Sequence, residues 1–273
     1  MGWRLFRFIR LGLVSCLLLW LVLMIFEESL IFFPSPYPEG DWRPADVHFE
    51  DAEFDSADGT SLHGWYAACK DARAVVLFCH GNAGNVTDRA HTLAALHDMV
   101  GVSVLIFDYR GYGKSQGRPS EEGVLADGRA ARAWLAEKEG IDPSEIVLLG
   151  RSLGGAVAVN LAVEDGARAL VLESTFTSMA EVGGYHYPWL PVRTLLRTRL
   201  DSAAKIGRYR GPLLQSHGDA DRVIPYGLGQ KLFEAANEPK RLVTIPGGGH
   251  NNAQPAEYYQ ALIEFLDDLP AVP

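Results

Sequence analysis

The chain has 273 residues, 48% of them hydrophobic, and a formal net charge of −9 at pH 7. This length and composition suffice for one domain with a substantial core. The acidic balance argues against a nucleic-acid partner, since the sequence has no large basic patch outside residues 193–210.

The first 33 residues differ in character from the rest. Three arginines within residues 1–10 precede an uncharged run over 11–26, which Glu27 closes. A run of this length is near the lower bound for a spanning helix, and Arg10 can extend it by snorkelling. The pattern predicts a basic flank over 1–10 and a transmembrane signal-anchor helix over 11–29. Arginines on this flank predict a single-pass protein with the folded domain outside, which means periplasmic in a bacterium and lumenal or extracellular in a eukaryote.

Two alternatives concern processing of this segment. A cleaved signal peptide needs a small-x-small site, which residues 24–28 do not offer. Lipidation at Cys16 is the other, although the apolar run continues past that cysteine. Residues 30–44 contain four prolines and predict an extended, semi-rigid tether.

From residue 45 the pattern becomes that of a folded domain. Alternating residues over 47–49 and 62–66 predict antiparallel strands joined across a turn at 56–60. Continuous apolar runs over 74–79 and 102–107 predict buried parallel strands.

Strand and helix patterns then alternate to the end of the chain. Helices are expected over 86–99, 120–139 and 154–164, and strands over 145–149, 168–172, 213–216 and 242–245. This alternation predicts an α/β fold with a parallel sheet and helices on both faces. Residues 174–211 interrupt the alternation.

A short motif over 150–154, Gly-Arg-Ser-Leu-Gly, joins an apolar strand to a helix of small residues. In so sharp a turn the backbone of Ser152 is strained, and glycines at 150 and 154 remove collisions with it. The turn places the serine oxygen over a helix N-terminus, which favours developing negative charge. Ser152 is therefore a candidate nucleophile; the alternative is a tight connection with a surface serine.

A serine hydroxyl needs a base and an acid to act as a nucleophile. The strand at 213–216 leads into a loop with Asp219 and Asp221, and the strand at 242–245 leads into a glycine-rich loop that ends at His250. Glu173, at another strand end, is a backup acid. Since carboxyl ends of parallel strands meet at one edge of a sheet, these loops can converge on Ser152.

Taken together, these segments resemble the α/β-hydrolase superfamily. They resemble most its small membrane-anchored branch, the abhydrolase-domain-containing serine hydrolases and their bacterial relatives. The matching segments lie at 80–85, 107–115, 150–154, 217–221 and 248–251 and cover about residues 45–270 in the family's order. The resemblance implies an eight-stranded, mostly parallel sheet in a catalytic domain over 45–273, with a cap at about 174–211.

The resemblance also implies the roles of individual residues. By the family's His-Gly-x-x-Asp pattern, the triad is Ser152, Asp221 and His250, with Asp219 left as a turn-former. The oxyanion hole is formed by the backbone N–H groups of Leu153 and Asn82, or of Ala83 in place of Asn82.

These observations predict a membrane-anchored serine hydrolase that cleaves an acyl ester or thioester through an acyl-enzyme intermediate. The expected substrate is a small-molecule or lipid acyl ester, and no cofactor or metal is required. The alternatives are a serine peptidase of the same fold and a non-catalytic membrane-tethered binding module. Cys69 and Cys79 are expected to be unpaired; a bridge between them is the alternative.

Overall fold

The computed structural model describes residues 2–270. Its strands are β1 (Phe33–Pro34), β2 (Glu50–Asp55), β3 (Ser61–Ala67), β4 (Val75–Cys79), β5 (Ala83–Gly84), β6 (Ser103–Asp108), β7 (Val147–Arg151), β8 (Ala169–Glu173), β9 (Leu213–Gly218) and β10 (Lys240–Ile245). Its helices are α1 (Gly2–Ile31), η1 (Val86–Arg89), α2 (Ala90–Ala94), η2 (Ala95–Val100), α3 (Glu121–Glu139), η3 (Pro143–Glu145), α4 (Leu153–Asp165), α5 (Met179–His186), α6 (Val192–Leu195), α7 (Ala203–Ile206), α8 (Tyr226–Ala235) and α9 (Ala256–Asp267).

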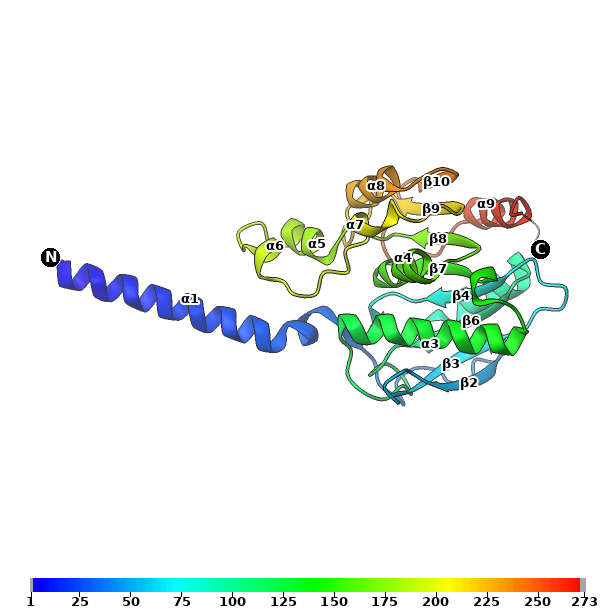
Figure 1. Cartoon of the computed structure of the whole chain (residues 1–273), viewed down its shortest axis with the longest axis horizontal. Helices are drawn as coiled ribbons and strands as arrows, with labels where there is room; N and C mark the ends of the chain where they lie inside the picture. The colour runs from blue at the N-terminus through cyan, green and yellow to red at the C-terminus, as the bar shows by residue number, and fades with distance from the viewer. Residues whose placement is uncertain (1, 271–273) are drawn as a thin grey trace.

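Eight of the strands form one sheet in the order β10-β9-β8-β7-β4-β6-β3-β2 (Figure 1). The six strands from β10 to β6 are parallel, whereas β3 pairs antiparallel with both β6 and β2. The predicted parallel sheet and its antiparallel edge are therefore present. The first edge strand lies slightly later than predicted, since pairing with β3 begins at Glu50 and residues 47–49 precede it.

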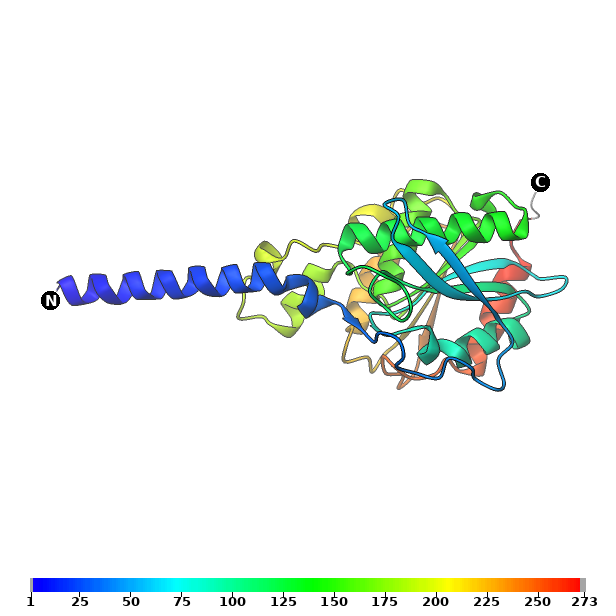
Figure 2. The ribbon, with the colours of Figure 1, turned by 90° about the horizontal axis from the view of Figure 1, so that it is seen from below.

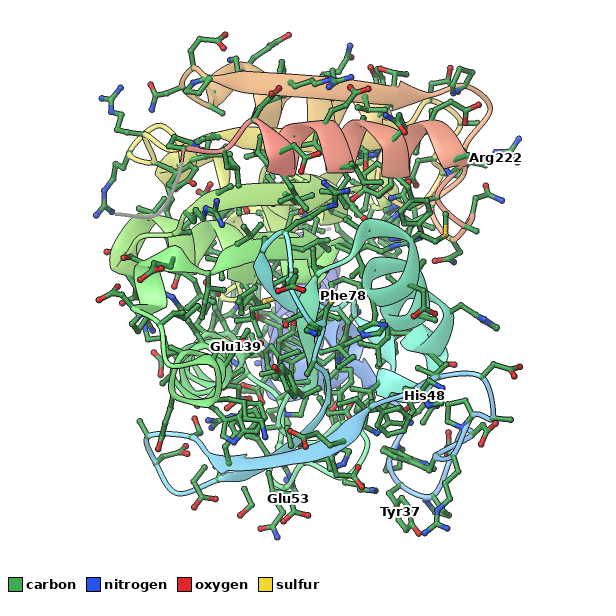
Figure 3. All side chains as sticks on the ribbon, turned by 90° about the vertical axis from the view of Figure 1, so that its right-hand side faces the viewer. Tyr37, His48, Glu53, Phe78, Glu139 and Arg222 are labelled. Carbon is green, nitrogen blue, oxygen red and sulfur yellow. The ribbon has the colours of Figure 1, made fainter. Side chains whose placement is uncertain are left out.

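Successive residues of the central strands point to opposite faces of the sheet, as the period of two in a strand requires. On β4, Leu77 belongs to one hydrophobic core, shared with α3 and α4, and Phe78 belongs to the other, shared with η2 and α9. Figure 3 shows Phe78 in the middle of the molecule, with Glu53 and Arg222 at its margins. Both faces of these strands are buried, which explains their continuous apolar runs.

Helices cover both faces of the sheet, with α3 on one side and α9 on the other (Figure 2). The helix predicted over 86–99 is not uniform, because the 3-10 turn η1, the α-helical turn α2 and the π-helical turn η2 follow one another. Asn85 caps its start by accepting a hydrogen bond from the Thr87 N–H at 2.9 Å. Gly101, in the left-handed conformation at φ 75°, ends it.

Helix α1 projects away from the sheet, with α9 at the other end of the molecule (Figures 1 and 2). Within the part of the chain that the structure describes, no helix combines the length and apolar character needed to cross a membrane. This finding contradicts the predicted single-pass location, and it gives no support to the predicted spanning helix over 11–29 or to the membrane as a partner. Hydropathy does not identify what an apolar run packs against, and here the C-terminal part of α1 contacts the protein itself.

Two smaller predictions concern the cap and the cysteines. Residues 174–211 hold the short helices α5, α6 and α7. Helices α5 and α6 lie beside the C-terminal half of α1 in both views (Figures 1 and 2), whereas α7 contacts α4 and α8. Cys69 and Cys79 are both free thiols.

Candidate active site

Ser152 lies at the turn between β7 and α4 in a conformation that is rare for a residue with a side chain. Its φ is 53° and its ψ is −119°. The turn is held by the Ser152 N–H, which donates to the Glu173 carbonyl at 2.9 Å, and by the Thr175 hydroxyl, which donates to the Ser152 carbonyl at 2.8 Å. A side chain at Gly154 would place its Cβ 1.9 Å from the Cys79 carbonyl oxygen. Backbone strain at a serine held by its surroundings is typical of a functional site.

A chain of contacts leads from Ser152 to His250 and on to Asp221. The His250 Nε2 lies 3.1 Å from the Ser152 Oγ, and the His250 Nδ1 lies 2.7 Å from the Asp221 Oδ2. These three residues come from the ends of β7, β10 and β9, so three loops at one edge of the sheet supply them. The structure thus brings together the three residues that the sequence pattern singled out.

Asp221 is buried and fully supplied with hydrogen-bond donors. Its Oδ1 accepts from the N–H groups of Val223 and Ile224, both at 2.8 Å, and the His217 Nε2 lies 3.4 Å from its Oδ2. Burial alone would raise the pKa of the Asp221 carboxyl, but the hydrogen bonds from His217, His250 and the backbone outweigh it and hold the pKa well below its usual range. The carboxylate is therefore ionised at neutral pH and faces the imidazole of His250.

The two other acids considered from the sequence lie elsewhere. Asp219 is exposed and accepts a hydrogen bond from the Gly247 N–H at 2.7 Å, which ties two loops together. Glu173 is buried and accepts a hydrogen bond from the Tyr258 hydroxyl at 2.5 Å. Within the described part of the chain, neither carboxylate is a hydrogen-bond partner of His250. The His250 imidazole contacts Asp221 instead.

The backbone next to Ser152 belongs to α4 and to the loop after β4. Leu153 is the first residue of α4, so its N–H has no acceptor within the helix. On the other side, a Cβ at Gly81 would lie 3.5 Å from the Ser152 Cβ, so the loop runs directly beside the serine. The Asn82 side chain turns away toward the N-terminal segment, and its Oδ1 accepts from the Tyr112 hydroxyl at 2.9 Å. Only the backbone N–H of Asn82 therefore remains as its candidate oxyanion donor.

His80 holds this loop in place through a hydrogen bond to its backbone. Its ring is fully buried, and its Nδ1 lies 2.6 Å from the Gly81 carbonyl oxygen. Burial lowers the pKa of His80 to about 3, so the ring is neutral at physiological pH and donates its Nδ1 proton to that carbonyl. His80 therefore has a structural role in this loop.

Arg151 is a site residue that sequence reasoning missed. Its guanidinium donates to the carbonyl oxygens of His250 at 2.7 Å and of Asn252 at 3.1 Å, and so ties the histidine loop to the nucleophile turn. The only signal in the sequence was its place in the variable position directly before Ser152. That position specifies no partner, because the two carbonyls lie about a hundred residues away along the chain.

Ser152 and His250 line a cavity of about 1070 Å³. Its walls come from the Asn82 loop, the cap and, unexpectedly, α1. Many of the lining side chains are large and apolar: Trp20, Met24, Leu30, Ile31, Phe33, Leu153, Phe176, Met179, Val182, Leu190, Val192, Leu195, Leu196, Val223 and Ile224. Among the side chains that the structure describes, no cluster of three or more suited to metal ligation was found.

The chain is similar to several known proteins. Residues 70–202 match the family model described as serine aminopeptidase, S33. The α/β-hydrolase domain-containing protein WAV2 of Arabidopsis thaliana is 30% identical over an alignment that covers 90% of this chain and 89% of that protein. The chain belongs to the α/β-hydrolase superfamily. This hydrolase is also 46% identical to an uncharacterized protein of Mycobacterium tuberculosis, over 84% of this chain and 82% of that one.

Solved structures show the same fold. The hydrolase superposes on esterase Pf2001 of Pyrococcus furiosus with a TM-score of 0.71 at 21% identity, over 87% of this chain and 99% of that one. It superposes on an acetyl xylan esterase from Paenibacillus sp. R4 with a TM-score of 0.67 at 19% identity, over 84% and 86% of the two chains. At these identities the likeness concerns the fold alone.

Proposed function

We propose that this hydrolase cleaves acyl esters or thioesters by two-step acyl transfer, with Ser152 as nucleophile, His250 as base and Asp221 as the acid that orients it. The observation that carries the proposal is the line of contacts from the Ser152 Oγ through His250 to Asp221, at 3.1 and 2.7 Å, on the wall of an apolar cavity. An acyl group and its carbonyl require this combination of an activated oxygen and an apolar pocket.

In the first step, the Ser152 Oγ attacks the carbonyl carbon while the His250 Nε2 accepts its proton. Asp221, ionised and hydrogen-bonded to the His250 Nδ1, stabilises the imidazolium that forms. The negative oxygen of the tetrahedral intermediate accepts hydrogen bonds from the N–H groups of Leu153 and Asn82. The intermediate then expels the alcohol or thiol, which takes the proton from His250. In the second step water attacks the acyl-enzyme by the same route and releases the acid.

The acids in the cavity lining favour an ester or thioester over a peptide. The family model that matches is described as an aminopeptidase, and binding a free α-amino group calls for an available carboxylate. Glu27 and Asp88 are the acids in the described cavity lining, and both already accept backbone hydrogen bonds, Glu27 from Thr198 and Asp88 from Asn85. Peptide hydrolysis is therefore the second candidate function.

The test is hydrolysis of p-nitrophenyl butyrate by the full chain, with the Ser152→Ala protein as blank and circular dichroism as the check on folding. We expect turnover by the wild type and none above background by the variant. Leucine p-nitroanilide, assayed in parallel, reports on the peptidase alternative. Equal rates for wild type and Ser152→Ala on both substrates would contradict a serine hydrolase and favour a binding module.

Arg151→Gln is expected to lower kcat by about 10- to 100-fold with little change in KM, because a loosely held histidine loop misplaces the base by a fraction of an ångström. The effect follows from loss of the two hydrogen bonds to the His250 and Asn252 carbonyls. Steady-state kinetics on the butyrate ester measure it, and Arg151→Lys should recover part of the loss by keeping one donor.

Arg132→Gln is the matched control for this change. Arg132 also donates to two carbonyls, those of Pro143 and Asp165, each at 3.0 Å, but at a distance from the cavity lining. Loss of these two hydrogen bonds should lower the free energy of unfolding and leave kcat unchanged. Equal kcat losses in the Arg132 and Arg151 variants would show that Arg151 acts only through overall stability.

A further inference from the structure

The cavity at Ser152 does not end at the cap, because helix α1 forms one of its walls. Trp20, Met24, Glu27 and Ile31 of α1 line it together with residues of the cap. Their spacing of four, three and four residues places them on one face of the helix. One stripe of α1 therefore faces the same space as the nucleophile.

Glu27 joins helix α1 to the cap. Glu27 is 6% exposed, and its Oε1 accepts hydrogen bonds from the N–H groups of Arg197 at 3.0 Å and Thr198 at 2.7 Å. The Arg197 guanidinium donates in return to the Met24 carbonyl at 2.7 Å. Burial alone would raise the pKa of Glu27, but these hydrogen bonds and the charge of Arg197 lower it, so the carboxylate stays ionised. The cap and α1 thus form one unit around the cavity.

The C-terminal end of α1 and the residues after it are joined to the loop beside Ser152. The Asn82 amide donates to the Ile31 carbonyl, and the Asn82 Oδ1 accepts from the Phe33 N–H at 3.3 Å. β1 pairs parallel with β5, which continues the Asn82 loop. Phe32, 2% exposed, anchors the segment in the core. The position of α1 relative to the nucleophile is therefore set by direct contacts.

The length of the part of α1 that lines the cavity indicates which substrate group fits beside it. From Trp20 to Leu30, α1 rises by about 15 Å at 1.5 Å per residue. A fully extended chain advances about 1.2 Å per bond, so the wall matches roughly a dozen bonds. The cap contributes several apolar side chains to this cavity, among them Met179, Val182 and Leu195. A long, unbranched acyl chain whose ester carbonyl lies at Ser152 fits this space.

We propose that α1 binds the acyl chain of the substrate and that Met24 determines the accepted chain length. The proposal rests on the ester hydrolase activity proposed above. It assigns to the hydrolase a preference for esters or thioesters of long-chain acids, with the chain between α1 and the cap. Met24 is suited to the role because it lies midway along the stripe and next to the Glu27 contacts that fix the helix.

The test is the ratio of kcat/KM for p-nitrophenyl laurate to that for p-nitrophenyl butyrate, measured on the full chain. Met24→Trp narrows the cavity at the α1 wall and not at Ser152, so it should obstruct a long acyl chain and not a short one. We expect kcat/KM for laurate to fall at least about tenfold while kcat/KM for butyrate changes less than about twofold. Val22→Trp is the matched control. Val22 is 48% exposed, belongs to the same helix and is not among the lining residues, so its ratio should equal that of the wild type.

The outcomes separate this proposal from the one it rests on. Butyrate hydrolysis no faster than in Ser152→Ala would contradict the hydrolase itself. Butyrate hydrolysis with an unchanged laurate ratio in Met24→Trp would overturn the role of α1 alone, as would an equal fall in Val22→Trp. Leu195→Trp, on the facing wall of the cap, should reproduce the selective loss, and it decides the question if Met24→Trp does not fold.

Discussion

Asp221→Asn is expected to lower kcat for ester hydrolysis by about 10⁴-fold. The substituted residue keeps a carbonyl oxygen for the N–H groups of Val223 and Ile224, so the loop should keep its shape. An amide N–H now faces the His250 Nδ1, which favours the tautomer with its proton on Nε2. That nitrogen, 3.1 Å from the Ser152 Oγ, then has no lone pair to accept the serine proton.

Two neighbouring acids provide the controls for this prediction. Asp219→Asn changes a carboxylate of the same loop that bonds the Gly247 N–H, and we expect a loss of kcat below about tenfold. Glu173→Gln replaces the carboxylate that accepts from the Tyr258 hydroxyl with a neutral amide, a weaker acceptor, and should reduce stability more than kcat. Steady-state kinetics and urea unfolding of all three variants distinguish the acids. A larger kcat loss in Asp219→Asn than in Asp221→Asn would reverse the assignment.

Gly154→Ala is expected to destabilise the hydrolase by more than about 4 kcal/mol, with little folded protein recovered. The added Cβ would lie 1.9 Å from the Cys79 carbonyl oxygen and 2.5 Å from that of His80. Both contacts are with backbone at the end of β4, which no side-chain rotation can relieve. The clash would push α4 away from the loop that lies beside Ser152.

Gly227→Ala is the control for the glycine substitution. Gly227 lies in α8, and no atom lies within 4 Å of where its Cβ would be. Alanine is favoured over glycine in a helix by about 1 kcal/mol, so this variant should be as stable as the wild type or slightly more. Urea unfolding with circular dichroism compares the two. A wild-type midpoint for Gly154→Ala would show that the turn is not tightly packed.

Much of the site could be predicted from short segments of the sequence. The alternation of apolar runs and helix patterns indicated the α/β sheet, and parallel strands bring their carboxyl ends to one edge. Ser152 directly follows such an end, and Asp221 and His250 lie in the loops that begin at two others, so local sequence placed them at that edge. Glycines at 150 and 154 indicated the sharp turn, because only a residue without a side chain fits there.

The partners of isolated side chains were not predictable. Arg151 binds carbonyls about a hundred residues away, and Glu27 binds the N–H groups of Arg197 and Thr198 across the cap. Nothing in the neighbouring sequence of either residue specifies these acceptors or donors. The same limit applies to α1, whose apolar run indicated a spanning helix although part of it lines the cavity.

The sequence by itself determined the class of fold and the edge of the sheet that carries the site, because these follow from local periodicity and strand direction. The choice of Asp221 over Asp219 rested on the resemblance to the α/β-hydrolase superfamily. Only the tertiary structure decided that α1 and the cap enclose the cavity. An apolar face is compatible with many partners, and its partner is set by packing between segments distant in the chain. The cavity that distinguishes one substrate from another is therefore a property of the folded hydrolase and not of any single motif.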